Sequence, residues 1–364
     1  MTERAVRPLA TAAALHVAVG ARFAVARRRA RILLVGSAVA ATGAIALGLA
    51  LGSVPVQLGD VVGVLLHRLG LSVAVTWSAP VETIVVELRL PRVLAATVVG
   101  AGLAVAGATF QGLLRNPLAD PYVLGTSSGA ALGAAIGLVL PIQAAFLGLG
   151  LVQLLAFAGA ALAVTVVYRV ARVGAAGSMT SVLLTGYAVG SLLAAALSLT
   201  MYLAGSTLRQ IFIYLLGSFS LASWQQLTLG LPIIVIGTAL LVARSRSLNA
   251  LLLGEDMAAH LGINVRRERV VLLGLATMVT AAAVALAGLI GFVGLLVPHT
   301  VRLLIGGNAR ALLPVSALAG GAFLCLADTV ARLPGELPVG IVTAVVGAPF
   351  FLFLLRRYRA GYEL

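Results

Sequence analysis

Long apolar runs separated by short polar segments dominate this chain. They fall near residues 32–52, 93–113, 123–140, 145–168, 180–203, 226–243, 270–289, 291–306, 311–327 and 339–355. Several are close to the roughly 20 residues that an α-helix needs to cross the hydrocarbon core of a bilayer. The pattern predicts an all-α polytopic membrane protein with about ten transmembrane helices.

The composition supports a membrane protein and excludes several other classes. Of the 364 residues, 61% are hydrophobic and 10% are charged, whereas soluble domains carry roughly a quarter charged residues. Cys325 is the one cysteine, so no disulfide framework is possible. All 25 basic residues are arginines, and they are scattered between apolar runs. That scatter argues against a nucleic-acid partner, which needs basic residues gathered on one soluble face.

The distribution of arginines predicts the topology. With a cytoplasmic N-terminus, 20 of the 25 arginines fall on the cytoplasmic side and five on the outer side, namely Arg68, Arg89, Arg92, Arg209 and Arg332. This asymmetry follows the positive-inside rule. We therefore expect a multi-pass protein of the bacterial cytoplasmic membrane with both termini in the cytoplasm.

The chain divides into two parts at the first apolar run. Residues 1–31 are arginine-rich, and we expect a cytoplasmic tail there, in which an amphipathic helix could lie on the membrane surface. The stretch 9–25 is too weakly apolar and too interrupted for a signal peptide. Residues 32–364 form a single transmembrane domain, whose longest cytoplasmic excursion is 244–269.

Small residues recur every fourth position in two of the runs, which places each set on one helix face. Such ridges let helix backbones approach closely. The two predicted packing ridges are Gly100, Ala104, Ala108 and Gly112, and Gly125, Gly129, Gly133 and Gly137.

The chain lacks the residues that usually support ATP binding, ion coupling and metal binding. A P-loop needs a lysine beside the phosphates, and the chain has none, so any ATP must be bound by another subunit. All eleven acids lie at run edges or in loops, which weakens but does not exclude an ion-coupled secondary carrier. The four histidines show no metal-ligand spacing. We expect no metal and no cofactor in this chain.

One short motif resembles a catalytic one. Residues 125–129 match G-x-S-x-G, the nucleophile elbow, which requires a strand before it and a helix after it. Here the motif opens a membrane helix and its glycines belong to a packing ridge. An intramembrane serine protease using Ser127 with His299 is the remote alternative, and helix packing is the favoured interpretation.

Two clusters indicate partners at opposite ends of the spans. Arg89 and Arg92 flank Pro91 on the outer side, where positive charge is disfavoured, and with Arg332 they predict a basic patch for an acidic partner protein. In the cytoplasmic excursion, acidic residues at a helix N-terminus precede an apolar helical pattern, with a glycine on each side. This predicted helix, an apolar knob for a cytoplasmic partner, comprises Gly254, Glu255, Asp256, Met257, Ala258, Leu261 and Gly262.

At these residues the chain resembles the FecCD family, the permeases of binding-protein-dependent ABC importers for iron–siderophore complexes, haem and cobalamin. The resemblance covers about residues 35–357. It rests on ordered motifs: Arg89-Leu90-Pro91-Arg92, Asn116-Pro117-Leu118-Ala119-Asp120-Pro121, Gly254-Glu255 with Leu261-Gly262, Gly291-Phe292-Val293-Gly294, Pro298-His299 with Arg302, Ala327-Asp328 with Arg332, and Glu336-Leu337-Pro338-Val339-Gly340. The long N-terminal tail is less typical of the family.

The resemblance implies an ABC importer permease of type II, like the cobalamin permeases. It implies ten helices in a subunit that forms a homodimer, or a related heterodimer, with the fifth and tenth spans near the pathway. Two ATP-binding-cassette subunits would dock below, and a substrate-binding protein would dock above. On this basis Arg89, Arg92 and Arg332 would meet the binding protein, and the helix from Glu255 to Leu261 would couple to the ATPase.

The expected function is therefore transport without chemical change of the cargo. A ferric siderophore is the first candidate, with haem and cobalamin as alternatives, because these permeases share the motifs. An ion-coupled carrier and the serine protease are the competing functions.

Overall fold

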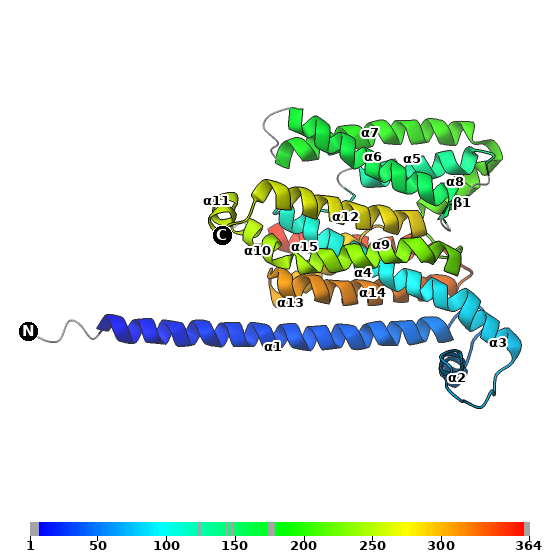
Figure 1. Ribbon diagram of the computed structural model, residues 1–364, viewed down its shortest axis with the longest axis horizontal. Coiled ribbons are helices and arrows are strands. Elements are labelled where there is room, and N and C mark those ends of the chain that lie inside the picture. The colour runs from blue at the N-terminus through cyan, green and yellow to red at the C-terminus, as the bar shows by residue number, and fades with distance from the viewer. Residues whose placement is uncertain (1–6, 123–124, 143–144, 147–148, 174–178, 360–364) are drawn as a thin grey trace, which may run out of the picture.

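The computed structural model describes residues 7–359 apart from 123–124, 143–144, 147–148 and 174–178. Ten long or apolar helices run side by side through it (Figure 1). They are α1 (Arg7–Ala50), α4 (Leu90–Leu113), α5 (Thr126–Val139), α6 (Leu151–Val173), α7 (Met179–Leu203), α9 (Trp224–Ala243), α12 (Val265–Ala287), α13 (Val293–Ile305), α14 (Ala309–Arg332) and α15 (Val339–Arg359).

Short elements connect these helices. They are α2 (Leu58–Arg68), α3 (Ala79–Thr83), a π-helical turn (Ile84–Arg89), a hairpin of β1 (Ala145–Phe146) and β2 (Leu149–Gly150), a 3₁₀ turn (Gly205–Thr207), α8 (Leu208–Leu215), α10 (Ser245–Leu252) and α11 (Glu255–His260). The helix α3, the π turn and α4 form one continuous rod over residues 79–113. Among the described residues, seven helices are long and apolar enough to span a membrane, and three shorter apolar helices, α5, α13 and α15, add to them. The all-α prediction of about ten spans is confirmed.

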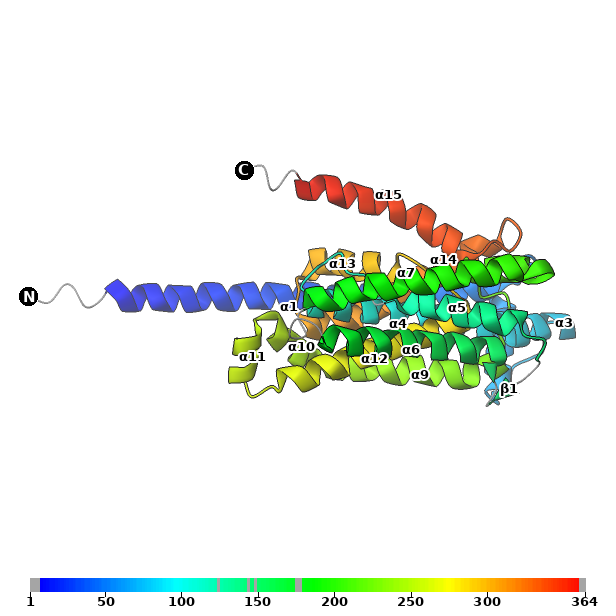
Figure 2. The same cartoon turned by 90° about the horizontal axis from the view of Figure 1, so that it is seen from above.

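The bundle has two distinct ends. The helices α10 and α11 lie at one end, where α1 begins and α15 ends, and we call this the α11 end (Figure 1). At the other end lie α2, α3 and the hairpin, and we call this the α2 end (Figures 1 and 2). The first residues of α1 and the last residues of α15 thus lie on the same side of the bundle.

Helix α4 forms the centre of the molecule. It contacts α9, α12, α13 and α14, and α14 in turn packs against α1. The helices α5, α6 and α7 form a separate group at one side, joined to the centre through α12. Most buried apolar side chains fall into one cluster built around α4, α12 and α14.

Helix α1 differs from the expected tail followed by a span. It runs without interruption from Arg7 to Ala50, and its first half projects beyond the bundle (Figure 1). The stretch that is long and apolar enough to span a membrane lies within Ala24–Ala50. No glycine or proline occurs between residues 21 and 35, and alanine and arginine are strong helix formers. The helix therefore continues through the charged stretch, so the predicted tail and the first predicted span share one helix.

Candidate functional site

Arg89 sits at the α2 end and binds the end of α1. Its Nη1 donates to the carbonyl oxygens of Leu49 at 2.7 Å and Ala50 at 2.9 Å, and its Nη2 donates to the carbonyl of Val54. The last carbonyls of a helix have no partner within the helix, and cations are favoured at this end of the helix dipole. The buried guanidinium of Arg89 therefore caps α1 and fixes it against α4.

Arg92, one turn further along α4, forms a buried ion pair with α14. Its Nε lies 3.0 Å from Oδ2 of Asp328, and its Nη2 lies 3.0 Å from Oδ1 of the same carboxylate. Arg332 reaches Asp328 from the same helix, with Nε at 3.3 Å from Oδ2. Arg332 also donates through Nη2 to the carbonyl of Gly48 on α1 at 3.0 Å. One buried carboxylate is thus shared by two arginines, and the cluster joins α1, α4 and α14.

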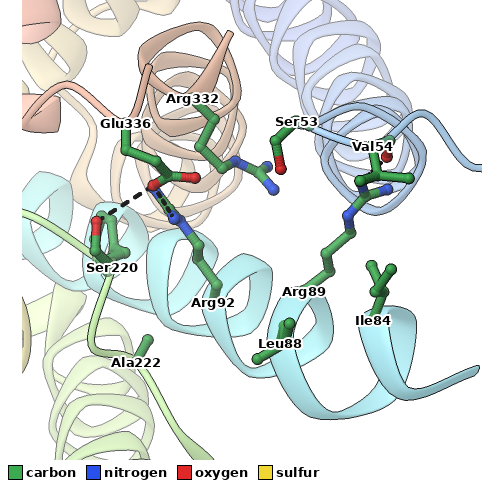
Figure 3. Close-up of a pocket in the computed structure, with 12 residues that line it drawn as sticks. Ser53, Val54, Ile84, Leu88, Arg89, Arg92, Ser220, Ala222, Arg332 and Glu336 are labelled. Carbon is green, nitrogen blue, oxygen red and sulfur yellow. Dashed lines mark hydrogen bonds and ion pairs between the residues drawn. The ribbon is translucent and has the colours of Figure 1, made fainter. Parts of the chain in front are cut away.

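A second carboxylate lies over this cluster, at its solvent side. Nη1 of Arg92 lies 2.6 Å from Oε2 of Glu336, and the hydroxyl of Ser220 donates to the same oxygen at 3.3 Å (Figure 3). The Glu336 side chain is 47% exposed. It is held on a tight turn, because Gly335 and Glu336 both have positive φ, 116° and 62°. Such a conformation is uncommon for a residue other than glycine.

A cavity of about 500 Å³ opens beside this cluster at the α2 end. Arg89, Arg92, Arg332 and Glu336 line its polar side, and Leu88 and Phe219 contribute to its apolar side (Figure 3). The structure therefore brings the three predicted arginines together around one hollow. It also buries each of them. Asp328 and Glu336 pair with Arg92 and Arg332, whereas Arg89 is bonded to backbone carbonyls.

Asp328 and Glu336 were expected at run edges and within two of the family motifs, but no partner was predicted for either carboxylate. A signal for Asp328 was present, because it stands four residues before Arg332 and therefore on the same helix face. Acids near the ends of apolar helices usually face the bundle and pair with a base. The pairing with Arg92 spans 236 residues of sequence and had no local signal.

At the α11 end, the predicted short helix is present as α11. Gly254 and Gly262 flank it with positive φ, 124° and 78°. Ala258 is buried, whereas Met257 and Leu261 are more than half exposed. This apolar knob was predicted from the sequence. Its role in docking stays a prediction.

Polar bonds tie α10, the helix that precedes the knob, to the core. The side-chain nitrogen of Asn249, on α10, donates to Oδ1 of Asn308 at 2.9 Å, and the amide of Ala309 donates to Oδ1 of Asn249 at 2.7 Å. Arg115 donates through Nη2 to the carbonyl of Leu251 at 2.9 Å. A displacement of α10 and α11 would therefore act directly on α14 and on the connection after α4.

That connection, described at residues 114–122 and Gly125, packs against the start of α13. The Tyr122 hydroxyl donates to the carbonyl of Ile290 at 3.1 Å and accepts from its amide at 3.3 Å. Asp120 accepts the amide of Tyr122 at 2.8 Å. Burial raises the pKa of Asp120 to about 6, an effect that this hydrogen bond opposes.

The predicted ridges lie between helices. A Cβ at Gly100 would stand 2.3 Å from the carbonyl oxygen of Gly320 on α14. On α5, Cβ atoms at Gly129 and Gly133 would stand 2.4 Å and 2.0 Å from carbonyl oxygens of α6. Gly112 faces Leu248 of α10, and Gly125 adopts positive φ at the N-cap of α5. Ser127 follows in the first turn of α5, and His299 is buried on α13.

Residues 40–357 match the FecCD transport family. The chain belongs to this family. A cobalamin import system permease of Halobacterium salinarum is 46% identical over 276 residues, covering 76% of this chain and 74% of that protein. A hemin transport system permease of Yersinia pestis is 41% identical over 277 residues, covering 75% of this chain and 83% of that protein.

A ferric-citrate import system permease of Bacillus subtilis is 39% identical over 286 residues, covering 76% of this chain and 82% of that protein. The fold agrees with these relatives. A solved metal-chelate type ABC transporter in an inward-facing conformation superimposes with a TM-score of 0.75 at 30% identity, over 90% of this chain and 99% of that one. This FecCD protein is therefore a membrane permease of the ABC importer class.

Proposed function

We propose that this permease carries a metal chelate, with a ferric siderophore as the first candidate and haem and cobalamin as alternatives. The observation that supports this is the set of relatives, which are permeases named for cobalamin, hemin and ferric citrate. In each of these cargoes an organic ligand encloses the metal. The cargo would pass through the protein without chemical change.

The α11 end would face the cytoplasm and dock an ATP-binding-cassette subunit. Twenty of the 25 arginines are assigned to this side, in agreement with the positive-inside rule. The exposed Met257 and Leu261 supply an apolar contact for the partner. The bonds of α10 to α14 and to Arg115 would carry motion from the ATPase into the bundle. Two ATPase subunits would serve two permease copies. ATP would bind to those subunits, because the lysine of a P-loop must come from another chain.

The α2 end would face a substrate-binding protein. Arg92 already holds Glu336, which is half exposed, and an acidic side chain of the binding protein could take the place of Glu336. The fixed guanidinium would then exchange one carboxylate for another, so little charge would be left unpaired. Arg89 and Arg332 would hold the rim in shape and raise the positive potential there.

A second copy of the permease would cover α7. Its exposed side chains include Tyr187, Leu192, Leu199 and Tyr202. A homodimer through this region would place α7 near a pathway on the two-fold axis. A cysteine at Leu192 in a Cys325→Ser background is expected to cross-link two copies in membranes. A cysteine at Leu162 on α6, which is similarly exposed, is the matched control and should not. Equal cross-linking at both positions would refute the α7 interface.

Docking can be tested with reconstituted permease and ATPase in lipid vesicles. Loaded binding protein should raise the rate of ATP hydrolysis. Arg89→Gln and Arg92→Gln should abolish this stimulation while basal hydrolysis, which reports an intact complex, persists. Arg209→Gln, an exposed arginine of α8 at the same end, is the control and should keep the stimulation. If stimulation survives in both buried variants, the arginine assignment is wrong.

The cargo needs a separate measurement. Uptake of a ferric siderophore, haemin and cobalamin into such vesicles, each offered at the same concentration with the cognate binding protein, should show ATP-dependent accumulation of one of them. Accumulation driven by an ion gradient without ATP would instead favour a secondary carrier and overturn the proposal.

A further inference from the structure

A second hollow lies at the α11 end, between α1 and α13. Its volume is about 520 Å³, and its lining divides between the two helices. Helix α1 contributes Val25, Ala26 and Arg29, and α13 with its C-cap contributes residues 302–306. The proposed transport function uses neither this hollow nor the charged part of α1.

Two arginines from different helices face this hollow. Arg29 is exposed, and among the described residues it makes no ion pair. Arg302 comes from the last turn of α13 and is partly buried. The described part of α1 carries no acidic residue, since the first acid after Glu3 is Asp60. Among the described residues, two arginines and no carboxylate line the hollow, which therefore suits an anion.

The rest of the lining is apolar and open. Val25 is 52% exposed, and Leu303 and Leu304 are similarly exposed. The apolar run of α1 begins at Ile32, three residues after Arg29, which corresponds to about 4.5 Å along the helix. Arg29 thus stands where the headgroup region meets the hydrocarbon core, and the exposed Ile32 and Val35 continue the apolar surface along α1.

We propose that this hollow binds an anionic phospholipid, with the lipid phosphate between Arg29 and Arg302 and an acyl chain along the exposed apolar face of α1. Basic pockets between membrane helices bind anionic headgroups in this way, and arginine pairs with phosphate through a bidentate fork. A free phosphate ion would use only the arginines. The adjoining apolar surface, which continues into the membrane, is what selects a lipid. The bound lipid bridges α1 and α13 where the projecting half of α1 leaves the bundle.

Native mass spectrometry of the delipidated protein in detergent provides the test. Phosphatidylglycerol should bind more tightly than phosphatidylcholine. Arg29→Ala and Arg302→Ala should each weaken the binding of phosphatidylglycerol about fivefold, and Arg29→Lys should retain part of it. Arg28→Ala removes the same charge one residue away, from an exposed position that does not line the hollow, and should bind as the wild type does.

Three results would overturn the site. An equal loss in Arg28→Ala would show that diffuse charge attracts the lipid, and equal binding of phosphatidylcholine would show that the phosphate recognition is absent. Displacement of the lipid by millimolar inorganic phosphate would reveal a simple anion site. If Arg302→Ala fails to fold, Arg29→Ala decides the matter, because Arg29 is exposed and its loss leaves no buried group unpaired.

Discussion

Helices α4 and α7 are nearly equal in hydropathy, but α4 lies at the centre of the bundle and α7 lies at its surface. The most apolar stretch of Ala79–Leu113 has a mean hydropathy of 2.0 and that of Ser181–Leu203 has 1.9. Yet 78% of the first stretch is buried in the bundle, against 11% of the second. Apolar content therefore decides that a helix spans the membrane, because lipid and protein interior are equally apolar. Apolar content does not decide whether lipid or protein surrounds the helix.

Close contacts and buried polar bonds distinguish the two helices. In α4, Gly100 and Gly107 touch the backbones of α14 and α13, and Arg92 forms its ion pair with α14. In α7, a Cβ at Gly190 would meet its nearest atom at 3.7 Å. Large side chains such as Tyr187 and Tyr202 cover the outer face of α7. The central helix is thus specified by small and charged residues, and the outer helix leaves a surface for lipid or a second copy.

The largest expected effect comes from removing the buried carboxylate that holds α4 to α14. Asp328→Ala leaves Arg92 and Arg332 buried with one shared partner missing, and it should lower the free energy of unfolding by about 3–5 kcal/mol. Denaturation in detergent micelles measures this. Glu87→Ala removes an exposed acid and should change stability by no more than about 0.5 kcal/mol. Equal losses would mean that the ion pair does not anchor α4.

Adding one methyl group to each helix gives the next largest contrast. A Cβ at Gly107 would lie 1.8 Å from the carbonyl oxygen of Gly294, so Gly107→Ala should cost about 1–3 kcal/mol of stability by overpacking. The new methyl group of Gly190→Ala in α7 meets its neighbours at ordinary van der Waals distance, and the substitution should be neutral or stabilise the protein by up to about 1 kcal/mol through helix propensity. The difference between the midpoints of denaturation is the measurement, and a reversed order would refute the packing argument.

A smaller contrast comes from deleting single hydroxyl groups. Tyr122→Phe leaves the buried carbonyl and amide of Ile290 without their partner, and should cost about 1–2 kcal/mol. Tyr187→Phe, on the exposed face of α7, should leave the denaturation curve unchanged. If Tyr122→Phe is equally silent, the connection after α4 does not depend on this bridge.

A dependence on pH provides a further test. The pKa of Asp120 is raised to about 6 in the folded protein, above its ordinary value near 3.9. The folded state therefore holds a proton that the unfolded state has lost, and the stability contributed by this group falls as pH rises from about 4 to about 6. Asp120→Asn should reduce the decrease in stability between pH 4.5 and 7.5. An identical pH profile in the variant would exclude Asp120 as its source.

The sequence predicted those parts of the protein that depend on local pattern. The ten apolar helices follow from run length, and α11 follows from Gly254, the two acids after it and Gly262. The four-residue spacing of small residues predicted close helix contacts, and Gly100, Gly129 and Gly133 do lie against neighbouring backbones. The docking and coupling roles assigned to these residues remain predictions.

Features that depend on distant residues could not be predicted. The arginines were expected on the outer surface because the topology places them at the outer ends of apolar runs. The burial of Arg89 and Arg92 depends on the end of α1, Asp328 and Glu336, which lie far from them in sequence. The continuity of α1 was not predicted for a different reason: the charged residues 1–31 were expected to lie outside the membrane, and nothing in their pattern indicated that one helix would join them to the first span. The contrast between α4 and α7 required the packing of the whole bundle.

The length of α1 has a geometric consequence. Its 44 residues extend about 66 Å at 1.5 Å per residue, about twice the 30 Å thickness of the hydrocarbon core. About half of the helix therefore stands clear of the bilayer as a rigid spacer beside α11 (Figure 1). Any large protein that approaches this end must fit beside that rod, so α1 restricts the directions from which a partner can reach the bundle.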